Sequence, residues 1–301
     1  MKKEFYILLL IILFSCVSKN DGSIENMIKI LSKNDKKLEK PTEREWLYSH
    51  KEKGQTFIQY KTCSPLRIID SRNIIYLQPI GNFDSLHYNL IRYKRDYLQI
   101  FYQLEVKILT TLPNKLIPDT AKRMNDGIEQ IYAPYVLNDI LIKRIPKDAI
   151  VIMALTEQDL YPNPSWNYVF GLASYKSRVG VTSMYRFCNY KIDSTNYQIC
   201  LKRLINVSSH EIGHMFTMKH CVNAVCTMNG SNNLSETDTK PNRLCSECTG
   251  KLAWNLNFYP YNRALELKKF FLQHKMKEDF QKNKKDIHLM EVYGLNSFQN
   301  D

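Results

Sequence analysis

Apolar residues between residues 74 and 155 recur in patterns that predict alternating strands and helices. Short apolar runs are typical of strands, whereas apolar positions three or four residues apart mark one face of a helix. The predicted strands are Ile74 to Gln78, Val106 to Leu109 and Ala149 to Leu155, the last of them buried and central. The predicted helices are one marked by Leu86, Leu90, Tyr93, Tyr97 and Phe101, and helical stretches around Thr120–Tyr132 and Tyr135–Lys143.

The second half of the chain continues with a hairpin or a long irregular strand, Phe170 to Phe187. A helix that is compatible with burial follows, with apolar positions at Ile199, Cys200, Leu204, Val207 and Ile212. Pro260 then precedes a charged amphipathic helix through about Gln281 and a polar tail to Asp301. Together these elements predict an α+β fold, with a mixed twisted sheet and the helix at residues 197–212 packed below it.

The end of that helix carries the sequence His210-Glu211-Ile212-Gly213-His214. Residues four apart share one helix face, with Cβ atoms about 5–6 Å apart, so both histidines can reach one Zn²⁺ ion. Glu211 lies about 100° further round the helix, beside the metal, where it can act as general base on a zinc-activated water. His220 completes the set if the chain leaves the helix near Phe216–Met218 and doubles back. Three neutral imidazoles leave one position open, which is typical of catalytic zinc.

A surface helix with two solvated histidines is the alternative interpretation. Unpaired charge at the edge of a buried helix is costly, so a carboxylate and two histidines there indicate a function. The favoured hypothesis is therefore a zinc-dependent metallopeptidase that acts on a peptide or protein substrate. The competing hypothesis is a zinc-stabilised peptide-binding or interaction module with weak or no turnover, in which Glu211 would have no task.

Two close pairs of cysteines follow the third histidine. Cys221 and Cys226, and Cys245 and Cys248, have the spacing of a four-cysteine zinc site. Two disulfides are the alternative, although the loop between Cys245 and Cys248 is too short to constrain much of the unfolded chain. The pattern favours a structural zinc ion, which makes two zinc ions per chain. Among the remaining Cys63, Cys188 and Cys200 at most one disulfide can form, and Cys200 is expected to be a small buried side chain.

The run HEIGHMFTMKHC-x4-C-x-M and the later NRLCSEC resemble the archaemetzincins, a family of zinc metallopeptidases in the metzincin clan. The resemblance extends upstream through residues 146–161, 169–173 and 179–181, and more weakly to Trp46 and residues 74–81. It implies that His210, His214 and His220 bind the catalytic zinc, that Glu211 is the general base, and that the four cysteines bind the second zinc. It also implies that Met228 lies below the first metal, and that the segment before the active-site helix pairs with extended substrate. Simple core filling is the alternative role of Met228.

Thr217 departs from the pattern of that family, which has a glycine seven residues after the first histidine. Glycine at this position allows the positive φ of the turn towards the third ligand, whereas a β-branched residue there is an outlier. The sequence leaves two possibilities: Thr217 adopts the strained conformation, or the turn shifts towards Met218–Lys219.

The amino terminus has the pattern of a bacterial lipoprotein signal. Lys2 and Lys3 precede the apolar run Phe5 to Phe14, which is too short to span a membrane as a helix. Residues 13–16 resemble a lipobox, so Cys16 is expected to be lipidated and to anchor an exported protein to a membrane of the cell envelope. The alternative is a cleaved secretory signal with a chance cysteine.

The charge distribution and composition set the domain boundaries. Residues 1–16 are the expected signal, residues 17–45 a polar tether with a short helix around Ile24–Leu31, residues 46–259 the catalytic domain, and residues 260–301 a helical extension. The net charge is +12, but basic residues are scattered among acidic ones, so a solvated surface is favoured and no nucleic-acid partner is expected.

Overall fold

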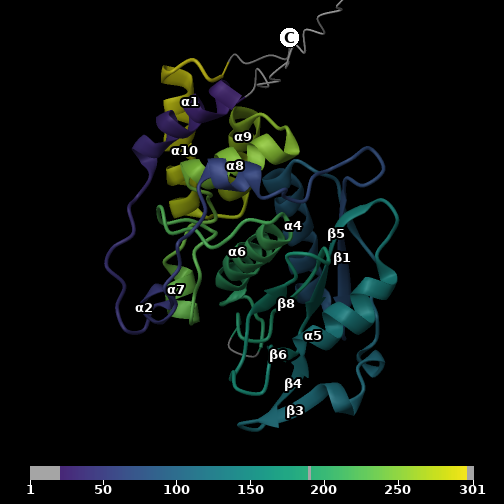
Figure 1. The fold of residues 1–301 in the computed structure, drawn as a ribbon. Coiled ribbons are helices and arrows are strands. Elements are labelled where there is room, and N and C mark those ends of the chain that lie inside the picture. Colours follow the sequence, from purple (N-terminus) through teal and green to yellow (C-terminus); the bar gives the residue numbers. More distant parts are fainter. Residues whose placement is uncertain (1–20, 189–190, 297–301) are drawn as a thin grey trace, which may run out of the picture.

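The computed structural model describes residues 21–188 and 191–296 (Figure 1). Its main sheet has the strand order β2–β1–β5–β8–β7, in which β7 is antiparallel to β8 and the other neighbours are parallel. The strands are β1 (Ile74–Ile80), β2 (Val106–Ile108), β5 (Ala149–Thr156), β7 (Gly171–Ala173) and β8 (Val179–Ser183). The three strands and the hairpin predicted for these segments are therefore confirmed.

Both faces of this sheet are covered, which is why β5 is apolar over most of its length. Met153 and Leu155 belong to a core shared with helices α4 (Ser85–Tyr102) and α6 (Tyr197–Met215) on one face. Ile152 and Ala154 pack on the other face against α5 (Ala133–Tyr135) and the π-helical turn Val136–Leu141. Helix α6 packs on β7 and β8 beside α4. The helix that carries the two histidines therefore lies against the sheet, as predicted.

A second sheet of three strands extends from the main one. It contains β3 (Lys122–Asn125), β4 (Ile128–Tyr132) and β6 (Asp159–Tyr161), so the helical prediction for Thr120–Tyr132 is wrong. Asp126 and Gly127 have φ values of 50° and 75°. Positive φ at both central residues is the two-residue turn that joins antiparallel strands, and Asp-Gly is its characteristic pair. The helical stretch predicted next is present as α5, the π-helical turn and the 3₁₀ turn Ile142–Arg144.

Helices from both ends of the described chain gather at one end of the molecule (Figure 1). They are α1 (Asp21–Leu31), α8 (Ser246–Leu256), α9 (Pro260–Gln273) and α10 (Lys277–Val292). Ile24 and Met27 of α1 are buried in a core with Ile287 and Met290 of α10. The short helix expected around Ile24–Leu31 is therefore present, but it is packed into the fold, whereas most residues from 36 to 45 are exposed as expected for a tether.

The predicted carboxy-terminal helix is divided in two. Helix α9 ends at Gln273, and Lys275 has a φ of 55°, which turns the chain back on itself. Helix α10 packs along α9 and continues to Val292, through residues that were expected to form a polar tail. Three of the side chains that α10 buries, Asp279, Asn283 and Asp286, are polar. Its buried face therefore lacks the regular apolar spacing that predicts a helix, and the sequence pattern did not indicate one here.

Short elements complete the chain. They are α2 (Trp46–Ser49), α3 (Phe57–Thr62), α7 (Leu234–Asp238) and the 3₁₀ turns Ser32–Asn34, Asn114–Leu116 and Asp119–Ala121. A disulfide joins Cys188 to Cys200, so Cys200 is buried as expected but bonded, whereas Cys63 is free and exposed. In residues 21–188 and 191–296 no helix has the length and apolar character needed to span a membrane. Cys16 lies outside the described residues.

Candidate metal centre

Helix α6 presents His210 and His214 from one of its faces, close to its carboxy-terminal end. Gly213, between them, lies against Met228: a Cβ atom at this glycine would be 2.5 Å from the Met228 sulfur. Met228 is 1% exposed. The structure therefore places Met228 beneath the helix turn that carries the histidines, where it also fills the core.

The third histidine approaches through a sharp turn after α6. Thr217 has a φ of 70°, so the first of the two possibilities for this residue is correct. Its N–H donates to the His214 carbonyl oxygen at 2.8 Å, and the Met218 N–H donates to the Gly213 carbonyl oxygen at 3.0 Å. These bonds close the helix end in a left-handed turn. The turn brings the His220 ring centroid within 5.1 Å of that of His210 and 4.9 Å of that of His214.

The hydrogen bonds of the imidazoles fix their tautomers. Nδ1 of His210 lies 2.9 Å from the Thr227 carbonyl oxygen, and Nδ1 of His214 lies 2.7 Å from the Met218 carbonyl oxygen. Because a carbonyl oxygen only accepts, each Nδ1 carries the proton and each Nε2 carries a lone pair. The two Nε2 atoms are 2.9 Å apart. Two lone pairs that face each other at this distance repel unless a cation lies between them.

The three histidines together fit a zinc ion. Each offers a ligand nitrogen within 4.8 Å of the others, and Zn–N bonds are about 2.0–2.1 Å long. Burial and the neighbouring imidazoles lower the pKa of His210, and they lower the pKa of His214 to about 3. Both rings are therefore neutral at physiological pH, which is the state that binds a metal.

The four cysteines form a separate buried cluster. Cys221, Cys226, Cys245 and Cys248 are free thiols whose sulfur atoms lie within 4.8 Å of one another. The Cys221 and Cys245 sulfurs are 3.6 Å apart, close to the separation of about 3.8 Å that tetrahedral Zn–S bonds of about 2.3 Å impose. The Cys226 sulfur also accepts hydrogen bonds from the backbone N–H groups of Met228 and Cys245. This donor set fits a four-cysteine zinc site, and the cysteines form no disulfides.

Glu211 lies beside the three histidines, on the side of strand β7. It is 8% exposed, and burial raises its pKa to about 8. A Cβ atom at Gly171 would be 2.7 Å from Glu211 Cγ. The absence of a side chain at Gly171 therefore lets the edge of the sheet approach the carboxylate closely.

A cleft of about 880 Å³ opens onto the histidines and Glu211. Its walls come from α6, from β7 with the preceding loop, and from α2. Tyr175, in the loop between β7 and β8, lies in this cleft with its hydroxyl 2.9 Å from His214 Nδ1. The volume falls within the range of about 300–1,000 Å³ that is usual for ligand sites.

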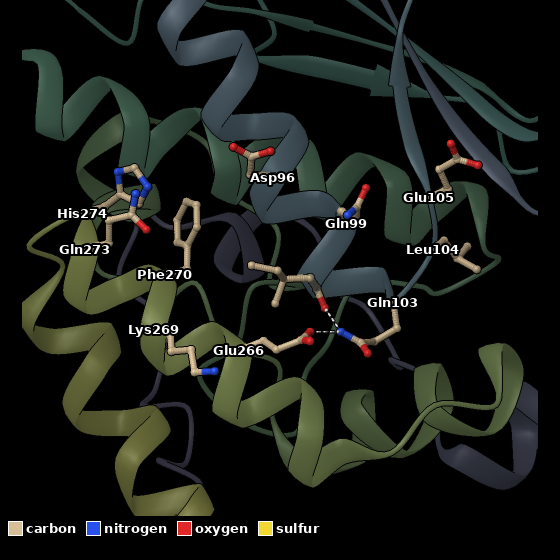
Figure 2. A pocket seen from close by; sticks show the side chains of 11 residues that line it. Asp96, Gln99, Gln103, Leu104, Glu105, Glu266, Lys269, Phe270, Gln273 and His274 are labelled. Atoms are coloured by element: carbon tan, nitrogen blue, oxygen red, sulfur yellow. Dashed lines mark hydrogen bonds between the residues drawn. The ribbon is translucent and has the colours of Figure 1, made fainter.

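A second cavity, of about 660 Å³, lies between α4 and α9 (Figure 2). Gln103 donates a hydrogen bond to Glu266 there, at 2.6 Å. Within residues 21–188 and 191–296, the groups of three or more potential metal ligands are the histidine and cysteine clusters, and neither lies in this cavity. The chemistry therefore belongs to the first cleft.

Two residues beside His220 escaped the sequence analysis. Glu52 Oε1 lies 2.8 Å from His220 Nδ1, and the Trp46 ring packs edge-on against the His220 ring. Glu52 and His220 are separated by 168 positions in the chain. No local pattern relates residues so far apart, although the weak resemblance that began at Trp46 pointed to this segment.

A helix that carries HExxH, a third histidine beyond a turn, and a cleft bordered by a free strand edge are the features of a zinc-dependent metallopeptidase. The sequence model described as peptidase family M54 matches residues 74–254. Human archaemetzincin-2 is 33% identical over 252 residues, which cover 71% of this chain and 68% of that protein. The archaemetzincin of Pyrococcus furiosus is 29% identical over 185 residues, which cover 60% of this chain and 93% of that protein.

A solved structure of the same family also resembles this chain. The crystal structure of the archaemetzincin of Methanopyrus kandleri has a TM-score of 0.51 and 27% identity, covering 64% of this chain and 99% of that chain. The chain thus belongs to peptidase family M54, the archaemetzincins, and is a zinc metallopeptidase. The family resemblance and the α+β fold class predicted from the sequence are both confirmed.

Proposed function

We propose that this chain hydrolyses peptide bonds with a zinc ion held by His210, His214 and His220, and with Glu211 as general base. The observation that carries this proposal is the convergence of the imidazoles, two of which have lone pairs directed at each other, beside a buried carboxylate. A purely structural metal site would give the carboxylate no task.

The chemistry divides between the metal and the side chains. A zinc ion held by these three imidazoles would act as a Lewis acid, which polarises the scissile carbonyl and lowers the pKa of the attacking water. Glu211 takes the proton from that water and returns it to the leaving amine. The carbonyl groups of Thr227 and Met218 hold two imidazole rings in the orientation that this requires.

The free edge of β7 is suited to bind an extended substrate. The Phe170 carbonyl oxygen and the Ser174 N–H are hydrogen-bonded to β8. In an antiparallel strand alternate residues face opposite sides, so Gly171 and Ala173 direct their N–H and C=O groups to the free edge. Because Gly171 approaches the Glu211 side chain, a peptide paired with this edge would pass close to Glu211, which is how strand addition would bring a scissile bond to the site.

The cysteine cluster takes the second zinc ion in this proposal. Cys221 follows His220 directly, and Cys226 lies two residues before Met228. A zinc ion bound by the four thiolates would therefore hold both ends of the loop that lies beneath and beside the histidines. Its role is structural, because four cysteines leave no open position.

Zinc content tests the two sites separately. We expect about two zinc ions per chain in the purified full-length protein, about one in His214→Ala and about one in Cys245→Ser. Wild-type protein with one zinc ion that His214→Ala does not remove would contradict the catalytic site.

Turnover is tested with a mixture of peptides and the Glu211→Ala variant. We expect cleavage by the wild type, and cleavage about 10²–10⁴-fold slower by Glu211→Ala with its zinc content unchanged. Peptide binding without cleavage by the wild type would favour the peptide-binding module instead.

We also propose that Cys16 carries a lipid anchor. The support is sequence alone: two lysines, a short apolar run and a lipobox-like end at Ser15-Cys16. Metabolic labelling with an alkyne fatty acid in a bacterial host is expected to mark the wild type but not Cys16→Ser. Equal labelling of both would place the lipid elsewhere, and absence of labelling would favour a cleaved secretory signal.

A further inference from the structure

The segment before the family match contributes to the candidate metal centre. Residues 45–52, here called the strap, include α2 and lie outside the matched residues 74–254. The chain runs from α1 along one side of the molecule and brings the strap beside α7 (Figure 1). The strap ends at Glu52, whose carboxylate lies 2.8 and 3.0 Å from Nδ1 of His220.

His220 differs from the other two histidines in how its ring is held. His210 and His214 donate from Nδ1 to backbone carbonyl oxygens, both within 17 positions of the donor in the chain. His220 instead donates to a side-chain carboxylate from a distant segment. Its ring orientation therefore depends on the strap, whereas the other two depend on α6 and the loop that follows.

The Glu52 carboxylate is itself fixed by Trp46. The indole Nε1 of Trp46 donates to Glu52 Oε1 at 3.1 Å. The indole ring stacks on His50, with ring centroids 3.7 Å apart, and packs edge-on against His220, with centroids 5.2 Å apart. Gly230 leaves the space for the indole, since a Cβ atom there would overlap the ring.

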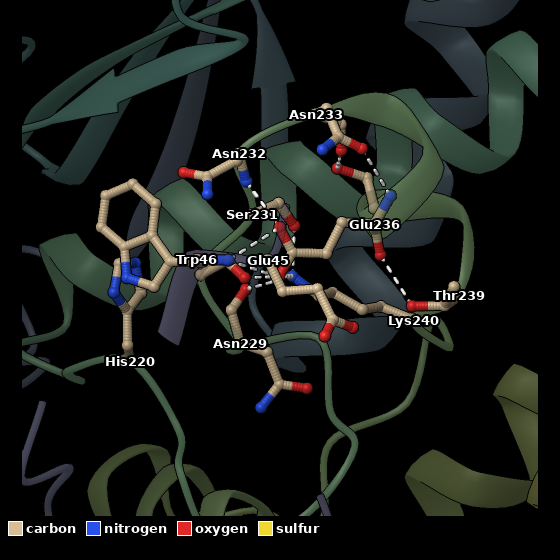
Figure 3. Close-up of polar contacts among 12 residues, drawn as sticks. Glu45, Trp46, His220, Asn229, Ser231, Asn232, Asn233, Glu236, Thr239 and Lys240 are labelled. Atoms are coloured by element: carbon tan, nitrogen blue, oxygen red, sulfur yellow. Dashed lines mark hydrogen bonds and ion pairs between the residues drawn. The ribbon is translucent and has the colours of Figure 1, made fainter. Parts of the chain in front are cut away.

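The strap is anchored to α7 and the loop that precedes it (Figure 3). The Trp46 backbone N–H donates to both Glu236 carboxylate oxygens, at 3.0 and 3.1 Å. Glu236 is in turn 3.8 Å from the buried ammonium group of Lys240, which also donates to the Gly230 carbonyl oxygen. A continuous polar network thus runs from Lys240 through Glu236, Trp46 and Glu52 to His220.

We propose that Glu52 is the positioning residue for the third zinc ligand, with Trp46 and Glu236 holding it in place. This rests on the proposed function, because it takes His220 as a ligand. A carboxylate that accepts the Nδ1 proton fixes the tautomer with the lone pair on Nε2 and makes the imidazole a stronger donor to the metal. Loss of such a partner typically weakens metal affinity by about 10–100-fold.

The test is the zinc affinity of the histidine site in the full-length protein. Glu52→Gln, Glu52→Ala and Trp46→Phe are equilibrated with free zinc set by a chelating buffer, and zinc per chain is counted at each concentration. We expect Glu52→Gln and Glu52→Ala to need about 10–100-fold more free zinc to fill one of the two sites, with the other site unchanged. Trp46→Phe, which removes the indole N–H that Glu52 accepts together with part of the ring packed on His50 and His220, is expected to have a smaller effect in the same direction.

Matched controls separate this role from general destabilisation. Glu43→Gln changes an exposed carboxylate just before the strap and is expected to behave as the wild type. If Glu52 contributed only to folding, its substitution would lower the thermal stability but leave the zinc affinity of the histidine site unchanged. Zinc affinity of Glu52→Gln and Glu52→Ala within twofold of the wild type would therefore overturn the proposal.

One further variant distinguishes this failure from failure of the proposed function. His220→Ala is expected to lose the zinc ion of the histidine site. If this variant kept both zinc ions with wild-type affinity, His220 would not be a ligand, and the assigned ligand set would fall together with the role of Glu52. If it lost one zinc ion while Glu52→Gln and Glu52→Ala kept both, only the positioning role would be wrong.

Discussion

Thr217 occupies a backbone conformation that glycine adopts without cost. A φ of 70° brings the Cβ of a branched residue close to its own backbone, at a cost of roughly 1–2 kcal/mol. Hydrogen bonds from the upstream chain offset part of this cost. The Leu66 N–H donates to Thr217 Oγ1 at 3.1 Å, and the Gln55 side chain donates to the Thr217 carbonyl oxygen at 3.3 Å.

We therefore expect the Thr217 hydroxyl to contribute to stability. Thr217→Val keeps the shape and the strain but leaves the half-buried Leu66 N–H without its acceptor, which costs about 1–2 kcal/mol. Thr217→Ser keeps the acceptor and is expected to remain within about 0.5 kcal/mol of the wild type. Urea unfolding of the zinc-saturated proteins measures both. A Val variant as stable as the wild type would mean that the hydroxyl does not compensate for the strain.

Lys94 is a second residue in an unfavourable environment, because burial opposes the charged form of its side chain. It is fully buried in α4, and its ammonium nitrogen lies 3.4 Å from the Met153 sulfur. Burial lowers its pKa from 10.5 to about 7. Between these two values the unfolded chain binds the proton more tightly than the folded chain, so stability rises with pH across this range. At and below pH 7 the cost of burying the charge is fully present.

Lys94→Met should consequently stabilise the protein at neutral pH. The expected gain is on the order of a few kcal/mol at pH 7, because each unit of pKa shift corresponds to about 1.4 kcal/mol. The difference between variant and wild type should shrink as the pH approaches 10. Chemical unfolding at pH 7 and pH 9.5 measures this difference. A gain that does not change with pH would show that packing, rather than charge, is responsible.

At the scale of elements, the contact between β7 and α6 sets the position of Glu211. Gly171→Ala would place a methyl group 2.7 Å from Glu211 Cγ, so the carboxylate has to move. We expect peptide cleavage to fall by about tenfold to a hundredfold, since small displacements of a catalytic group have effects of this size. Zinc content should stay at the wild-type value, because the three atoms nearest to this methyl group all belong to Glu211.

The neighbouring strand position provides the control for this prediction. Ala173→Gly removes a methyl group two residues further along the same strand and adds none against Glu211, so it should reduce cleavage much less. Steady-state cleavage of one peptide by the three proteins makes the comparison. Wild-type activity of Gly171→Ala would mean that the edge strand does not constrain the carboxylate.

Elements with a strong local pattern were the ones that the sequence predicted correctly. The spacing of Leu90, Tyr97 and Phe101 identified α4, and the apolar run at residues 149–155 identified β5. The β3–β4 hairpin was missed because its signal is a single Asp126-Gly127 pair between strands with polar faces. In the candidate metal centre, the residues that could hold a metal stand close together in the chain, so their spacing was enough to predict them. Glu52 and Tyr175 reach the histidines only through the tertiary fold, which no local pattern encodes.

At the scale of the whole molecule, a buried ion cluster joins both terminal segments of the described chain to the loop between α7 and α8. Arg243, 7% exposed, donates to both carboxylate oxygens of Asp286 in α10, at 2.6 and 2.8 Å. It also donates to Asp35, just beyond α1, at 2.9 Å. Asp35 accepts further hydrogen bonds from the backbone and side chain of Ser246, next to Cys245. The terminal helices, which the sequence separated from the catalytic domain, are therefore coupled to the cysteine cluster.

Removal of the arginine should loosen both terminal segments together. Arg243→Met leaves two buried carboxylates without their partner, which is expected to lower the free energy of unfolding by about 3–5 kcal/mol. Lys143→Met breaks an exposed pair with Asp139 and should cost no more than about 1 kcal/mol. Hydrogen exchange in the zinc-saturated proteins should show amide protection falling in α1 and α10 of Arg243→Met, while β5 exchanges at the wild-type rate as long as the chain stays folded. Unchanged protection in α1 would mean that its apolar contacts with α8 and α10 hold the amino-terminal segment without the ion cluster.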